Sequence, residues 1–163
     1  MDFTFTDDQL LFQDEVKKFL ANEVTPEKIR QLWETETGRS EELWQALASM
    51  GLTGFTVPEE FGGLEMNAVD FVLLAQECGF FALPEPLVET VLVAVPLINA
   101  LSVDAVKFAW LPRIASGEAK VVVALSQNLL VADAHIADLL ILQHGDELHA
   151  VTKGQVKLTH NES

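Results

Sequence analysis

The stretch Gly117-Glu118-Ala119-Lys120-Val121-Val122-Val123-Ala124-Leu125 marks the point where the pattern of the chain changes. Before it, apolar residues recur at helical spacing, and after it, short β-branched runs alternate with turn residues. The runs cover residues 121–125, 139–142 and 156–158, with turn signals at His144-Gly145-Asp146 and Lys153-Gly154. Helices followed by strands predict an α+β fold. We expect an all-helical bundle over residues 1–117 and a strand region over residues 118–163.

Residues that favour helix N-termini divide the first part into segments. The capping side chains are Thr6, with Gln9 at capping-box spacing, Thr25 before Pro26, Ser40 before two glutamates, and Asn67. They predict helices after Thr6, from Pro26 to Trp33, from Ser40 to Gly51 and from Asn67 to Cys78. The run 87–95 is apolar nearly all round and predicts a buried central helix. Asp104 to Leu111 predicts one more helix, which ends near Pro112 and Gly117. Core packing is the expected role of Trp33, Trp44 and Trp110.

Composition narrows the classes of function. The 163 residues carry 10 Lys and Arg against 25 Asp and Glu, a net charge of −15, which would repel nucleic acid and anionic membranes. The single cysteine, Cys78, excludes an internal disulfide, and the longest apolar stretch, 87–101, is too short to span a bilayer. The first residues lack the pattern of a secretory signal. We therefore expect a soluble cytoplasmic protein.

Few residue clusters suggest chemistry by themselves. The side chains with metal-ligand chemistry are Asp133, His135, Asp138, His144, Asp146 and His149. No spacing places them on one face of a helix, so we expect them to lie in turns between strands, and no metal is assigned. Glu59 and Glu60 are expected to be solvated, and Cys78 to be a small buried hydrophobe. Neither a dinucleotide fingerprint nor a P-loop is present. The residues alone leave the chemistry unassigned.

Six motifs taken together resemble the acyl-CoA dehydrogenase family. In chain order they are Phe5-Thr6-x-x-Gln9, Leu43-Trp44-x-x-Leu47-Ala48-x-x-Gly51, Val57-Pro58-Glu59-Glu60-Phe61-Gly62-Gly63-Leu64, Glu77-Cys78-Gly79, Trp110-Leu111-Pro112-Arg113-Ile114-Ala115-Ser116-Gly117-Glu118 and Ala124-Leu125-Ser126. The resemblance implies a helical N-terminal domain followed by part of an antiparallel β-barrel domain. It also implies FAD between the two.

The same resemblance implies an activity. The family oxidises the Cα–Cβ bond of an acyl-CoA thioester: a carboxylate removes the α-proton, the flavin accepts the β-hydride, and electrons pass to an electron-transferring flavoprotein. Carried over to this chain, Leu125 and Ser126 would lie near the flavin, and Glu89 and Thr90 on the central helix would line the acyl pocket. Ordinary helix packing is the alternative for that pair. No catalytic base is assigned, and a homo- or hetero-oligomer is expected.

Two departures from the family pattern leave the function open. After Ser126 the chain lacks the family's Glu-Pro and Gly-Ser-Asp, and residues 131–140 resemble a later strand, so the strands between them are missing. The family's C-terminal helical domain has no counterpart before Ser163. One interpretation is an FAD-dependent acyl-CoA dehydrogenase subunit. Another is a non-catalytic partner with a degenerate flavin site in a heteromeric dehydrogenase, and a third is a helical interaction module without ligand.

Overall fold

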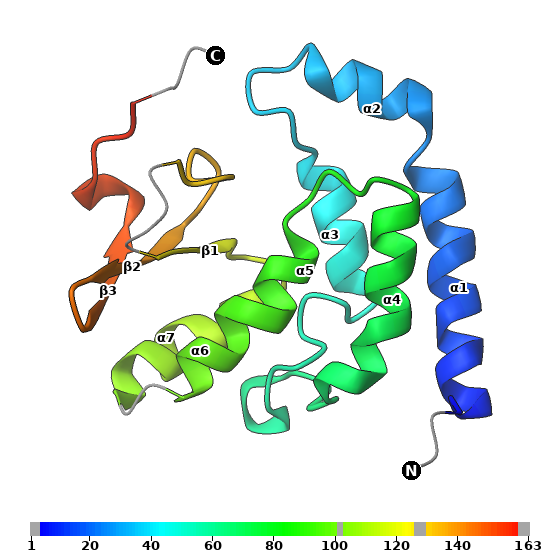
Figure 1. Ribbon diagram of the computed structural model, residues 1–163, viewed down its shortest axis with the longest axis horizontal. Coiled ribbons are helices and arrows are strands. Elements are labelled where there is room, and N and C mark those ends of the chain that lie inside the picture. Colours follow the sequence, from blue (N-terminus) through cyan, green and yellow to red (C-terminus); the bar gives the residue numbers. More distant parts are fainter. Residues whose placement is uncertain (1–3, 101–102, 126–129, 160–163) are drawn as a thin grey trace.

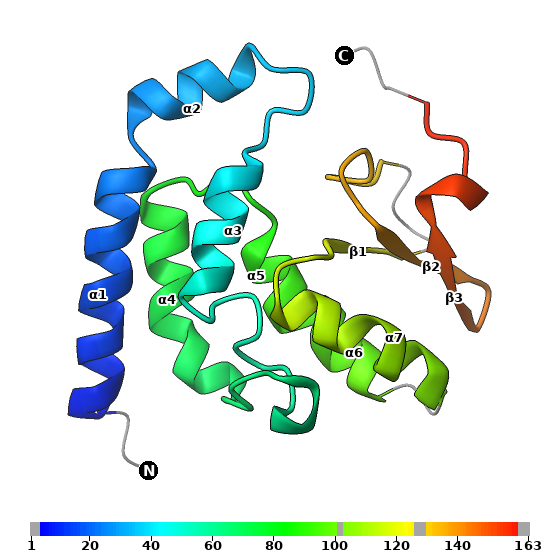
Figure 2. The same cartoon turned by 180° about the vertical axis from the view of Figure 1, so that it is seen from behind.

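The computed structural model describes residues 4–100, 103–125 and 130–159. Three upright helices form a bundle, α1 (Asp7–Glu23), α3 (Glu41–Ser49) and α4 (Ala68–Phe80), and α2 (Pro26–Trp33) crosses one end of it (Figure 1). A central helix and α7 (Asp104–Ala115) separate this bundle from a small sheet, as the reverse view also shows (Figure 2). The fold is α+β, as predicted.

The predicted helix starts are confirmed. Thr6 and Gln9 form a reciprocal capping box at the start of α1, with the Gln9 N–H donating to Thr6 Oγ1 at 3.2 Å. Thr25 caps α2 with Pro26 in its first turn, and Ser40 and Asn67 cap α3 and α4. Each cap satisfies backbone donors that a helix start leaves unpaired, which is worth about 1 kcal/mol.

One core holds the bundle together. Val16 and Leu20 of α1 pack with Trp44, Phe55 and Phe71, all 1% exposed or less. The Phe55 ring lies edge-on to Phe71, with centroids 5.1 Å apart. Full burial of such side chains contributes roughly 1.5–3 kcal/mol each, so the amphipathic α1 is fixed mainly by its contact with this cluster.

Trp33 is an exception to the expected tryptophan packing. Trp44 is fully buried and Trp110 half-buried, but Trp33 is 74% exposed on α2, a helix without any buried residue. The prediction of a core role for Trp33 was wrong, because α2 crosses the end of the bundle and does not pack along it (Figure 1).

The central helix is longer and less regular than predicted. It runs through α5 (Leu87–Glu89), a π-helical segment η2 (Thr90–Ala94) and α6 (Val95–Ala100). A π turn widens the helix and leaves carbonyl groups without their usual partner. The Thr56 hydroxyl donates to the carbonyl of Val91 at 2.6 Å and so satisfies one carbonyl of this segment.

Helix α7 also continues past its predicted end. It extends to Ala115 with Pro112 inside it, because Leu111 and Ile114 bury the last turn against the second core cluster. The end comes at Gly117, whose φ of +78° is left-handed and favours glycine. A Cβ there would lie 2.5 Å from Ala48 Cβ, so this glycine also permits close contact with α3.

The sheet is small, open and mixed. Its strand order is β1 (Val121–Ala124), β2 (Leu139–His144) and β3 (Glu147–Thr152), with β1 and β2 parallel and β2 and β3 antiparallel. A wholly antiparallel region was expected, but β2 runs beside β1 in the same direction, with Val121 opposite Leu139. The predicted strand at 156–158 is not formed, because the chain turns after β3 into a short 3-10 helix, η3 (Lys153–Gln155).

Within the described ranges, every helix is too short or too polar to cross a membrane.

Candidate functional site

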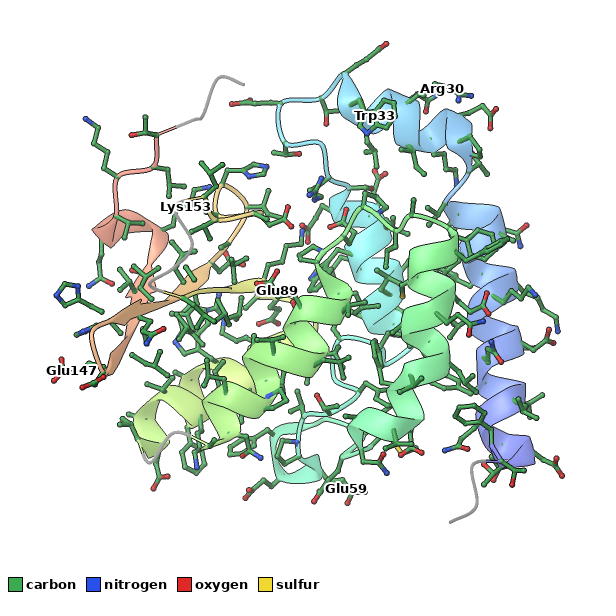
Figure 3. The ribbon with its side chains drawn as sticks, viewed as in Figure 1. Arg30, Trp33, Glu59, Glu89, Glu147 and Lys153 are labelled. Carbon is green, nitrogen blue, oxygen red and sulfur yellow. The ribbon has the colours of Figure 1, made fainter. Side chains whose placement is uncertain are left out.

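The central helix meets the sheet at Glu89, and this junction is the candidate site. Glu89 lies at the end of α5 beside β1 (Figure 3). Its Oε1 accepts a hydrogen bond from the backbone N–H of Val123, at 3.3 Å. Below the junction, Ala94, Val95 and Ile98 share one apolar cluster with Val121 and Val123. The two parts of the chain are thus packed together next to the site.

Thr90 follows Glu89 but points elsewhere. It is fully buried, and its hydroxyl donates to the carbonyl of Pro86 at 2.8 Å. The structure therefore places the two predicted pocket residues side by side in the chain with different surroundings: Glu89 faces β1, and the Thr90 hydroxyl is used within the helix.

The predicted flavin contacts are described only in part. Leu125 follows β1 directly and is 45% exposed, and Ser126 lies outside the described residues. On the central helix, Val88 and Val93 are also exposed.

A cavity of about 400 Å³ lies next to Glu89, between the end of α4 and the start of the central helix. Its lining includes Cys78, Leu83, Val88 and Glu89. Burial raises the pKa of the Cys78 thiol to about 11, so the group is a neutral thiol at physiological pH. The expectation of a small buried hydrophobe is confirmed by its 4% exposure.

A charge network around the buried Lys120 and Glu85, which sequence reasoning missed, connects the exposed Glu41 of α3 to the start of the strand region. Lys120 Nζ lies 2.8 Å from Glu41 Oε2, 3.9 Å from Glu85 Oε2 and 5.2 Å from the centroid of the Trp44 ring. Burial raises the pKa of Glu85, although the Ser40 N–H donates to its carboxylate at 2.6 Å. Glu41, Glu85 and Lys120 are far apart in the sequence, so no pattern of spacing predicts that their charges meet.

The histidines and aspartates weighed as metal ligands are dispersed in the structure. Asp133 pairs with Arg39, and the His135 Nε2 lies 2.8 Å from the carbonyl oxygen of Thr37. The rings of His144 and His149 lie 6.5 Å apart on the β2–β3 hairpin. Among residues 4–100, 103–125 and 130–159, no three His, Cys, Asp or Glu side chains could hold one metal ion.

The described residues do not form a site for the FAD that the family resemblance implies. The N–H of Val123 already donates to Glu89, whose carboxylate would repel an anionic group brought against β1. Lys120 and Arg39, two cations near the start of the strand region, both face carboxylates.

Comparison with known proteins follows the same division of the chain. Residues 6–118 match the family model described as "Acyl-CoA dehydrogenase, N-terminal domain". Acyl-CoA dehydrogenase IpdE2 of Mycolicibacterium smegmatis is 27% identical over 144 residues, which cover 88% of this chain and 44% of that protein.

Two solved structures show the same fold. The ChsE4-ChsE5 complex of Mycobacterium tuberculosis matches with a TM-score of 0.82 and 21% identity, over 94% of this chain and 49% of that chain. An acyl-CoA dehydrogenase complexed with FAD from Bacillus anthracis matches with a TM-score of 0.72 and 21% identity, over 90% and 30% of the two chains. This chain therefore spans about half or less of the length of these relatives.

Proposed function

This chain belongs to the acyl-CoA dehydrogenase family, and on that premise we propose that it is part of a subunit that takes part in α,β-dehydrogenation of an acyl-CoA thioester. The observation that carries the proposal is the cavity of about 400 Å³ beside the central helix, whose lining includes Leu83, Val88 and Glu89. An acyl chain needs a concave, largely apolar site of this kind.

In this proposal the residues of this chain bind and orient. Glu89 lines the cavity together with Leu83 and Val88 and would contact the acyl group. Orientation matters because the α-proton of a thioester is only weakly acidic, so correct placement of the acyl group provides much of the rate. Leu125 and Ser126 would lie near the flavin, no catalytic base is assigned, and an electron-transferring flavoprotein would accept the electrons.

A homo- or hetero-oligomer in the cytoplasm is the proposed setting. A CoA thioester and a single, buried Cys78 both suit a reducing compartment. The substrate class within the acyl-CoA thioesters stays open between simple fatty acyl and steroid-derived groups.

A second candidate is a partner subunit that completes the site of another chain. The short connection between β1 and β2 favours it, because only residues 125–138 join these paired strands and the family's additional strands with flavin contacts do not fit in that segment. The similarity to a complex of ChsE4 with ChsE5 supports the same proposal.

Visible absorbance of the purified complete polypeptide separates these candidates. A flavin spectrum from the polypeptide alone, bleached by an acyl-CoA, supports the dehydrogenase subunit. Flavin that appears only when the polypeptide is co-expressed with a neighbouring family member supports the partner subunit. A colourless protein in both preparations contradicts both candidates and leaves the helical interaction module.

A further inference from the structure

The Glu89 carboxylate lies against the outer edge of β1. Two backbone contacts show which edge of the strand is already used: the N–H groups of Asp138 and Leu139 both donate to the carbonyl of Lys120, at 2.9 and 3.4 Å. The Lys120 N–H also points to this side and donates to Asp138 Oδ2 at 2.9 Å. The inner edge of β1 is therefore satisfied by β2 and by the residue before it.

Strand geometry then assigns Val123 to the other edge. The backbone N–H and C=O groups of successive residues in a strand point to alternate edges. Val123 is three residues after Lys120, so its backbone groups point to the edge that faces away from β2. In the part of the chain that the structure describes, no strand lies beside the Val123 N–H, since β1 stands at the end of the order β1-β2-β3. Glu89 Oε1 fills the position that a neighbouring strand's carbonyl would take, at 3.3 Å.

The backbone around Glu89 is fixed by side-chain hydroxyls. Thr90 Oγ1 donates to the Pro86 carbonyl at 2.8 Å, one turn before Glu89. Thr56 Oγ1 donates to the carbonyl of Val91, two residues after Glu89, at 2.6 Å. Glu89 thus leaves a helix that is anchored on both sides, so its carboxylate has a defined direction toward β1.

We propose that Glu89 is a positioning residue: its carboxylate holds the free edge of β1 on the central helix and so fixes the point from which Leu125 enters the active site. The role of Glu89 in an active site rests on the proposed function, whereas its contact with β1 does not. In this role Glu89 acts through the strand, and the oxygen of its side chain matters more than the charge.

Two conservative variants test this distinction. Glu89→Gln keeps an oxygen at the same reach but removes the charge, whereas Glu89→Asp keeps the charge but is one methylene too short for Val123. Glu59→Gln and Glu59→Asp, at an exposed position, are the matched controls. Each variant is made in the complete polypeptide, co-expressed with its neighbouring family member if flavin requires it.

Hydrogen exchange at the Val123 amide, followed by NMR or mass spectrometry, reports the contact itself. Because one hydrogen bond is lost, Glu89→Asp should speed exchange by about tenfold, and Glu89→Gln should change it by less than about threefold. In the dehydrogenase assay, Glu89→Asp should lose more kcat than Glu89→Gln. Faster exchange in Glu89→Gln than in Glu89→Asp, or a greater loss of kcat in Glu89→Gln than in Glu89→Asp, would overturn the proposal.

The two readouts separate the two proposals. Slow exchange of the Val123 amide in Glu89→Gln and fast exchange in Glu89→Asp, with no dehydrogenase activity in any preparation, would support the contact with β1 and contradict the proposed function. Full activity with an unchanged Val123 amide in both variants supports the function and contradicts the positioning role.

Discussion

Replacing Gly63 by Ala should unfold the loop that carries the Pro-Glu-Glu-Phe-Gly-Gly motif. A Cβ on Gly63 would lie 2.0 Å from the Val57 carbonyl oxygen and 2.5 Å from Val57 Cβ. Real Cβ atoms do not approach backbone so closely, and Val57 is fully buried, so the loop must move away.

The cost follows from what the movement breaks. The N–H groups of Gly63, Leu64 and Glu65 donate to the carbonyls of Pro58, Gly54 and Val57 at 3.2, 2.9 and 2.9 Å. Loss of these hydrogen bonds costs about 3 kcal/mol, and partial exposure of Val57 adds roughly 2 kcal/mol. The total of about 5 kcal/mol corresponds to a fall in Tm of roughly 10–20 °C for a protein of this size.

The neighbouring glycine provides a matched control. Gly62 has a left-handed φ of +83° and open space around its Cβ position, so Gly62→Ala should cost only about 1–2 kcal/mol. Gly154→Ala, with open space and no positive φ, should stay within about 0.5 kcal/mol of the parent protein. Urea denaturation followed by circular dichroism measures all three. A Gly63→Ala protein as stable as the Gly62→Ala protein would refute the reasoning.

Three further predictions concern buried ionisable groups. Lys120→Met should destabilise the protein by roughly 2–4 kcal/mol, because it leaves Glu85 buried without its nearby cation, and adding Glu85→Gln should recover part of this loss in urea denaturation. Because the pKa of Glu85 is raised above 4.5 in the folded state, its contribution to stability is fully present below pH 4.5 and is lost as pH rises through the folded pKa. Urea titrations at several pH values should therefore show Glu85→Gln gaining stability relative to the parent protein as pH rises, and a constant difference would contradict this. Cys78, whose thiol has a pKa of about 11, should resist alkylation by iodoacetamide at pH 8 in the folded protein and react in urea. Mass spectrometry measures the alkylated fraction, and rapid labelling without urea would contradict the burial of Cys78.

Local signals in the sequence predicted the helices well. Thr6, Thr25, Ser40 and Asn67 cap helices because each side chain satisfies donors a few residues away, and such contacts depend only on nearby residues. The boundary at Gly117 was equally visible, since a left-handed glycine at a helix end is a local feature.

Features that depend on distant contacts could not be predicted. The exposure of Trp33 depends on where α2 lies relative to the bundle, and the persistence of α7 past Pro112 depends on burial of Ile114. The parallel pairing of β1 with β2 depends on contacts between segments far apart in the sequence. For the candidate site, the family resemblance predicts Glu89 as a pocket residue, and this stays a prediction; its contact with Val123 joins residues 34 positions apart and has no signature in spacing.

Anaerobic titration of the purified complete polypeptide with acyl-CoA thioesters tests the central claim most directly. The titration is done with and without the co-expressed neighbour, on a straight-chain and a steroid-derived thioester, and follows flavin absorbance and the mass of the thioester. The account predicts bleaching of the flavin together with loss of two hydrogen atoms from one of the thioesters. Colourless protein in both preparations, or flavin that no thioester reduces, would contradict it.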